Sequence, residues 1–294
     1  MERYIKLITL CLSGIFFIAS CSVVEKFKQE KPKWTAVEQT DQIVWADDDS
    51  EVAIVILHFE EKSGDWLSGT TEKRYFKHQI FTQKINDKEK FPLTELRDHQ
   101  VGQVFFMKSA AYLITESILP GGARRFDKID LKGHEILIIE TPDSVHQPCQ
   151  TQQNSPPVET EPTTPIPPVV YHTVIPSPDG GQLAHVYSPE CGKASVEFLD
   201  AESLTVLDNQ TFDIDEPMEV TWHRDGYIVF TTSKRDKAWK VKAKESPLPV
   251  LPPKCLSPVT TSSNVSAEGR LVYFDESNQL TTREIGRKEA FGCQ

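Results

Sequence analysis

A short turn motif recurs along this chain between successive β-rich runs. The segments SPDGG (177–181), HRDG (223–226) and SAEG (266–269) each separate two such runs. Aspartate in such a turn can bond to its own backbone, and glycine adopts a positive φ without steric cost. No long stretch has helical periodicity, so the chain is predicted to be all-β. The turn glycines are expected to have a structural role: Gly180, Gly226 and Gly269.

The runs group into five units. Four runs lie between residues 171 and 212, and four more lie between 219 and 251. Two earlier stretches fit the pattern without an Asp-Gly turn, and residues 259–286 form the last unit. A period of about 45 to 65 residues is typical of a β-propeller. We therefore predict about five four-stranded antiparallel blades over residues 34–294, each packed against its neighbours. Two separate β-sandwiches are the alternative.

The ends and the tryptophans refine this prediction. Trp34 to Val37 would supply the outermost strand of the last blade and so cover an exposed edge. Trp45, Trp222 and Trp239 are expected in the blade cores.

The turns also resemble a known family of repeats. SPDGG, with HRDG and SAEG at equivalent places, is similar to the TolB-type repeat, a relative of WD-type propellers. Residues 177–181 match that signature best. The resemblance implies a role in the cell envelope. TolB proteins carry a further N-terminal α/β domain that this sequence does not show, so the Tol partners are not inferred.

The first twenty residues have the layout of a secretory signal. Arg3 and Lys6 precede an apolar run that is too short to span a bilayer. The run ends at residues 18–21, IASC, which resembles the bacterial lipobox. The resemblance implies that residues 1–20 are removed, that Cys21 is acylated, for example with palmitate, and that residues 21–33 form a lipidated tether. Ser22 implies sorting to the outer membrane, facing the periplasm or the surface. A plain secretory signal is the alternative.

The charge of the chain limits its partners. The formal net charge is −11. Binding to nucleic acid requires clustered Lys and Arg, so no nucleic-acid partner is expected. The membrane, through the lipid anchor, and a protein or an envelope polymer remain as expected partners.

Four cysteines remain after the signal and the lipid site, and they are predicted to form two disulfides. Outside the cytoplasm an even number of cysteines indicates disulfides, and no CxxC spacing indicates zinc or a redox centre. In the blade model all four lie on one face, which favours Cys149 with Cys191 and Cys255 with Cys293. Pairing of Cys191 with Cys255 stays open.

Residues 142–168 are rich in proline and also contain Cys149. Proline removes backbone donors and fixes φ, so this segment is predicted to be a loop. A disordered linker between two domains is the alternative.

No local motif indicates catalysis. The sequence lacks GxGxxG, a P-loop and a GxSxG elbow. His134-Glu135 begins a zinc-protease pattern that has no second histidine. Asp47, Asp48, Asp49 and Glu51 could bind calcium, but a solvated turn is favoured.

These observations predict a lipid-anchored envelope propeller that acts as a non-catalytic binding or scaffold module. No cofactor or metal is expected, and the chain is not expected to be an enzyme. One alternative is a calcium-dependent propeller hydrolase or lactonase, and another is a purely structural surface lipoprotein.

Overall fold

The computed structural model describes residues 33–63, 70–141, 172–189, 192–214, 217–232, 237–251 and 262–291. These residues form antiparallel sheets and one short helix, α2 (Gly286–Phe291). No helix in these ranges has the length and apolar character needed to cross a bilayer.

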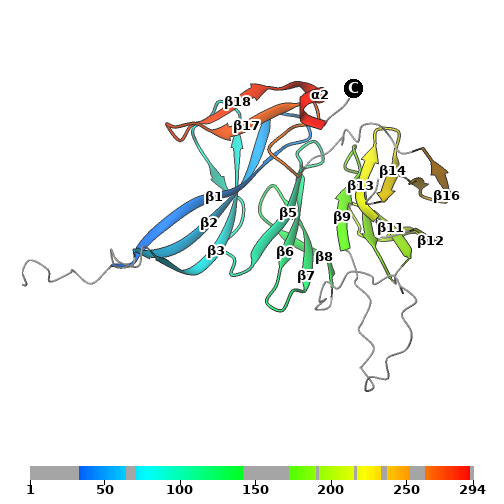
Figure 1. Cartoon of the computed structure of the whole chain (residues 1–294), viewed down its shortest axis with the longest axis horizontal. Coiled ribbons are helices and arrows are strands. Elements are labelled where there is room, and N and C mark those ends of the chain that lie inside the picture. Colours follow the sequence, from blue (N-terminus) through cyan, green and yellow to red (C-terminus); the bar gives the residue numbers. More distant parts are fainter. Residues whose placement is uncertain are drawn as a thin grey trace, which may run out of the picture. The chain divides into compact units, whose positions relative to one another are not determined.

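Four sheets have four strands each, and every strand pairs with the next one along the chain (Figure 1). The first sheet contains β1 (Thr35–Trp45), β2 (Glu51–Ser63), β3 (Thr71–Lys84) and β4 (Phe91–Pro92). The second contains β5 (Gln100–Met107), β6 (Tyr112–Ile118), β7 (Arg124–Asp130) and β8 (Glu135–Glu140). The third contains β9 (His172–Pro176), β10 (Gln182–Tyr187), β11 (Lys193–Asp200) and β12 (Val206–Asp213).

The fourth sheet contains β13 (Pro217–His223), β14 (Tyr227–Thr232), β15 (Ala238–Lys242) and β16 (Glu245–Val250). The fifth sheet has two strands among the described residues, β17 (Arg270–Phe274) and β18 (Leu280–Glu284), and Val265 makes a bridge to Leu271. Two of the four strands that the sequence predicted there thus lie among the described residues.

The chain divides into two compact units. One comprises Met1–Val37 and His58–Phe76, and the other comprises Glu38–Leu57 and Lys77–Gln294. In the first unit the described residues form a ribbon from the start of β1, the end of β2 and the start of β3. Its Trp34 ring lies against Arg74, whose Cζ is 3.9 Å from the ring centroid. Tyr75 has a φ of 59° in mid-strand and is 65% exposed.

This arrangement corrects the expectation for Trp34 to Val37. The segment does not complete the last blade, because β1 begins at Thr35 and pairs with β2 in the first sheet. The Trp34 ring is held there by Arg74 and by Lys62, whose Nζ is 5.7 Å from the ring centroid.

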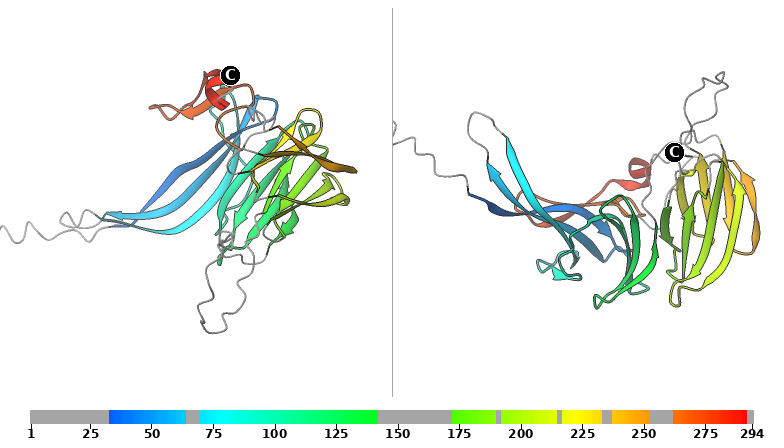
Figure 2. Two further views of the ribbon diagram at one scale, coloured as in Figure 1. Left: turned by 45° about the vertical axis from the view of Figure 1, so that its right-hand side comes forward. Right: turned by 90° about the horizontal axis from the view of Figure 1, so that it is seen from below.

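In the second unit, apolar cores are shared between neighbouring sheets. One core joins the third sheet to the second and the fourth, and contains Phe126, Phe198 and Phe230. Another joins the first and second sheets, and a third joins the first and fifth sheets around Trp45 and Val272. Both views in Figure 2 show the strands of β5–β8 standing beside those of β9–β12. Burial of both faces is what stacked blades require.

The turn before the second strand has the same geometry in all five sheets; in the fifth sheet it precedes β17. The amide of the fourth turn residue donates to the carbonyl of the first, with N···O distances between 2.9 and 3.1 Å. The fourth residue always has a positive φ. The pairs are Ala46 with Asp49, Lys108 with Ala111, Ser177 with Gly180, His223 with Gly226 and Ser266 with Gly269.

The predicted fold class, all-β with propeller-type blades, is confirmed by these sheets and by their shared cores. Trp45 and Trp222 are 2% and 3% exposed, and Trp239 packs against the largest core, as predicted.

Candidate functional site

A groove of about 560 Å³ runs between the free edge of β1 and the fifth sheet. One wall is Thr40–Ile43 of β1, and the other is formed by residues 262–264 and by Val272–Phe274. β1 is an edge strand, since it pairs with β2 alone among the described strands. At the end of β1 the Trp45 amide already donates to the Ser263 carbonyl at 3.4 Å, whereas the outward N–H and C=O groups of residues 40–43 can pair with an added strand.

Backbone bonds hold the wall opposite β1 in place. The Trp45 indole Nε1 donates to the Asn264 carbonyl at 3.1 Å, and the Val272 amide donates to the same carbonyl at 2.9 Å. Asp49 and Arg270 add an ion pair at 3.8 Å. Burial raises the pKa of Asp49, although a hydrogen bond with Ser266 and the charge of Arg270 oppose that shift. The groove is thus built on packed elements.

The groove combines apolar and polar side chains. Ile43 and Phe274, both half-buried, supply apolar surface, and Tyr273 is 38% exposed. Thr40, Asp41 and Ser262 add polar groups at its margin. An extended peptide needs this combination, because its backbone pairs with a strand edge and its alternate side chains fill apolar pockets.

A second group of candidate functional side chains lies across the third sheet. His172 Nδ1 lies 2.9 Å from His185 Nε2, and His185 Nδ1 lies 3.0 Å from a Glu197 oxygen. His185 and Glu197 are opposite each other on β10 and β11. A carboxylate only accepts, so His185 Nδ1 carries the proton and its Nε2 accepts from His172 Nδ1–H. This leaves His172 Nε2 with a lone pair of fixed direction.

The surroundings keep these histidines neutral. Burial lowers the pKa of His172 to about 4, and His185 and Arg124 act in the same direction. Burial also lowers the pKa of His185, although Glu197 opposes that shift. Chemically, His172 is a neutral hydrogen-bond acceptor and base whose orientation is fixed by two further side chains.

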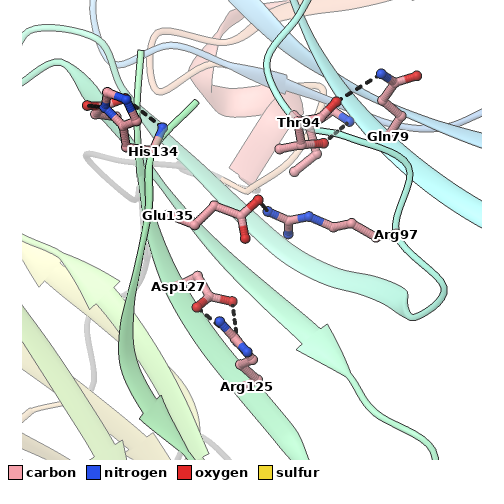
Figure 3. A network of polar contacts seen from close by, with 9 residues as sticks. Gln79, Thr94, Arg97, Arg125, Asp127, His134 and Glu135 are labelled. Carbon is pink, nitrogen blue, oxygen red and sulfur yellow. Dashed lines mark hydrogen bonds and ion pairs between the residues drawn. The ribbon is translucent and has the colours of Figure 1, made fainter. Parts of the chain in front are cut away.

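A network of ion pairs lies on the second sheet and beside β3 (Figure 3). Arg97, 7% exposed, pairs with Glu135, and its backbone exchanges two 2.8 Å bonds with His78. Arg125 Nε donates to both Asp127 oxygens, at 2.9 and 3.0 Å. Asp127 is 1% exposed. Burial, with the charges of Arg97 and Arg125, lowers the pKa of His99. We interpret this network as structural.

The residues weighed for calcium bind to separate partners. Asp47 accepts from the Ser109 amide at 3.1 Å, Asp48 from the Ser50 amide at 3.0 Å, and Glu51 pairs with Lys108 at 2.7 Å. Within the described ranges no group of His, Cys, Asp or Glu side chains is placed to hold a metal ion. His134 lies just before β8 and is bound by Asp130 at 2.8 Å.

The other predicted positions divide into two groups. Gly180, Gly226 and Gly269 lie in the repeated turns with φ of 69°, 76° and 82°. The signal (residues 1–20), the tether up to residue 32, the Pro-rich segment (142–168) and the cysteines lie outside the described residues: Cys21, Cys149, Cys191, Cys255 and Cys293.

Comparison with known proteins gave matches only at the level of structure. No family model matches the chain, and no curated protein matches it. Similar solved structures include an acylaminoacyl peptidase of Pyrococcus horikoshii, with 10% identity and a TM-score of 0.43 over 73% of this chain and 32% of that chain. A chain of a mitotic checkpoint complex has 11% identity and a TM-score of 0.36 over 85% and 77%. A chain of a nidogen/laminin complex has 11% identity and a TM-score of 0.35 over 68% and 76%.

These matches correct one expectation. The prediction that the chain is not an enzyme is contradicted, because the similar structures include peptidases. No activity is transferred from them, since this chain spans 32% of the Pyrococcus peptidase chain and 46% of a puromycin-hydrolyzing peptidase of Mycobacterium tuberculosis.

Proposed function

We propose that this protein is a lipid-anchored β-propeller of the bacterial cell envelope that binds an extended segment of a partner protein in the groove beside β1. The observation that carries the proposal is the joining of a free strand edge, Thr40–Ile43, to an apolar wall at Val272–Phe274 in one groove. Main-chain pairing gives such a site affinity, and the side-chain pockets give it specificity.

The anchor is part of the proposal. Cleavage before Cys21 and acylation of its thiol and of the new amine would hold the chain on the outer membrane, since several acyl chains bind where one binds only marginally. Residues 21–33 would then be the tether. The side-chain bonds of the SPDGG turn support the TolB-type repeat: Ser177 Oγ donates to Asp179 at 2.7 Å, and the Gly181 amide donates to Asp179 at 3.0 Å.

The four remaining cysteines would form two disulfides once the protein is outside the cytoplasm. We propose the pairs Cys149 with Cys191 and Cys255 with Cys293. Each disulfide closes a loop of about forty residues and contributes on the order of 4 kcal/mol by the chain-entropy estimate.

Site-specific crosslinking tests the groove. A photoreactive amino acid at Tyr273, which is 38% exposed in the groove, is compared with one at Val206, which is 59% exposed on β12. In native envelopes a defined protein partner should crosslink from position 273 and not from 206. Equal crosslinking from both positions, or none from 273, would contradict the groove proposal.

Metabolic labelling tests the anchor separately. Cells that express the natural chain or Cys21→Ala are grown with a palmitate analogue. We expect label on the natural chain alone. Equal labelling of both chains would remove the lipid anchor and leave the groove proposal untouched.

A further inference from the structure

A second cavity, of about 390 Å³, lies between the turn that follows β3 and the β17–β18 hairpin. It is separate from the groove beside β1 except that Phe274 lines both. Its volume falls within the range of small-molecule sites. One side is formed by residues 86–88 and Lys90, and the other by Asn278, Gln279 and Leu280.

Both sides of this cavity are fixed by backbone bonds. The Ile85 amide donates to the Ser50 carbonyl at 3.2 Å, and the Asp87 amide donates to the Lys84 carbonyl at 3.1 Å. In the hairpin, the Asp275 carboxylate accepts from the amides of Ser277 and Gln279, each at 2.9 Å. The hydrophobic residues behind the cavity belong to the core shared by the first and fifth sheets, namely Phe81, Ile85, Phe274 and Leu280. The cavity is therefore preformed.

One buried amide in this cavity has an unused oxygen. Gln83 lines the cavity and is 3% exposed. Its Nε2 donates to the Asp87 carbonyl at 2.6 Å, which fixes the amide orientation, since that carbonyl can only accept. Its Oε1 has no hydrogen-bond partner in the structure. A buried acceptor without a partner is unfavourable, so a bound donor group would stabilise the site.

The remaining polar groups indicate what the ligand presents. Asn86, Asn278 and Gln279 each offer an amide that both donates and accepts, Lys88 and Lys90 offer donors, and the Asp87 carboxylate accepts. Hydroxyl groups match amides, because they also donate and accept. A carboxylate, or a fully ionised phosphate ester, has no hydrogen to give to Gln83 Oε1. An ammonium ion alone has no acceptor for the lysines.

We propose that this cavity is a binding site for a sugar unit, free or within a polysaccharide. A sugar hydroxyl donates to the Gln83 amide oxygen, further hydroxyl and ring oxygens accept from Lys88 and Lys90, and the apolar ring face lies toward Phe274 and Leu280. The site is distinct from the protein-binding groove and does not depend on the lipid anchor.

The test is saturation-transfer NMR on the full chain with glucose, galactose and N-acetylglucosamine at millimolar concentration. We expect transfer to the ring protons of at least one of them. Gln83→Met removes the amide and keeps the length of the side chain, so it should weaken binding roughly three- to tenfold. Asn278→Gly removes a second amide from the hairpin and should weaken binding similarly; Asn278 has a φ of 55°, which glycine accepts.

The matched control is Gln79→Met. Gln79 also lies on β3 and donates to a backbone carbonyl, that of Thr94 at 2.8 Å, but it does not line this cavity. Binding should be unchanged in this variant. Absence of transfer from every sugar, which would mean that only water fills the cavity, would overturn the proposal. Equal binding by both cavity variants and the control, or competition by phosphate alone, would also overturn it.

Discussion

The Tyr112 hydroxyl donates a 2.8 Å hydrogen bond to the Gly180 carbonyl, and so joins the second sheet to the repeated turn of the third. Tyr112 is 2% exposed, and burial raises the pKa of its phenol well above the usual value. Tyr112 directly follows the repeated turn that ends at Ala111, and Gly180 is the last residue of the equivalent turn in the third sheet. Neighbouring blades are thus connected by a bond as well as by a shared core.

Removal of this bond should lower stability without disturbing the core. Tyr112→Phe leaves the ring in place and the Gly180 carbonyl without its donor, so we expect a loss of about 1 kcal/mol. Urea unfolding measures the change. Tyr273→Phe, at an exposed position, is the control and should have no effect.

Two substitutions in the repeated turn are predicted to change the free energy of unfolding in opposite directions. Gly180→Ala should lower the free energy of unfolding by about 1–3 kcal/mol, because φ is 69° and a new Cβ would lie 2.4 Å from the Ala110 Cβ. Ala111→Gly, at a φ of 61°, should raise it by up to about 1 kcal/mol.

A control for this pair is Ala184→Gly on β10, where the alanine is fully buried. This substitution should destabilise by about 1 kcal/mol. If Ala111→Gly destabilised as much as Ala184→Gly, the turn at Ala111 would not have the geometry described.

The histidine pair predicts a loss of stability in mild acid. The ordinary pKa of histidine is 6.5 and that of folded His172 is about 4, so between these values the unfolded chain binds more protons. Stability should therefore fall as the pH drops from about 6.5 to 4. His172→Gln keeps a donor toward His185 but cannot be protonated, so its stability should fall less across that window. Denaturant unfolding at each pH measures this, and identical pH profiles for the two chains would contradict it.

The ion pair of the second sheet predicts non-additive effects. Arg125, whose side chain is 36% exposed, holds the buried Asp127 carboxylate, so Arg125→Met should cost about 1–2 kcal/mol. The double change Arg125→Met with Asp127→Leu should cost less than Arg125→Met alone, since no unpaired charge remains. Additive losses in unfolding experiments would show that the pair is not coupled.

Much of the fold could be predicted from the sequence because glycine marks three of the five repeated turns. Gly180, Gly226 and Gly269 signal their turns directly, and the strands beside them were predicted to within a few residues. Asp49 and Ala111 adopt the same positive φ because the surrounding sheets enforce it, which no local pattern reveals. The first strand was misplaced because its contacts with Arg74 and Lys62 are tertiary.

The candidate sites were harder to predict. The pairing of His172 with His185 follows from the register of the β9–β10 hairpin, in which Leu183 is opposite Pro176, so the SPDGG turn could have indicated it. The groove brings residues 40–43 beside residues 262–274, and the cavity brings Gln83 beside Asn278. Segments that lie so far apart in the sequence meet only in the folded chain, and a single sequence carries no signal for their contact.

Hydrogen exchange at the free edge of β1 tests the central claim most directly. Backbone exchange of residues 40–43 is compared with and without the partner segment that crosslinks to position 273, and β12 serves as the internal control. The groove proposal predicts slower exchange at alternate amides of β1 and no change in β12. A bound complex in which the β1 amides exchange as fast as in the free protein would contradict it.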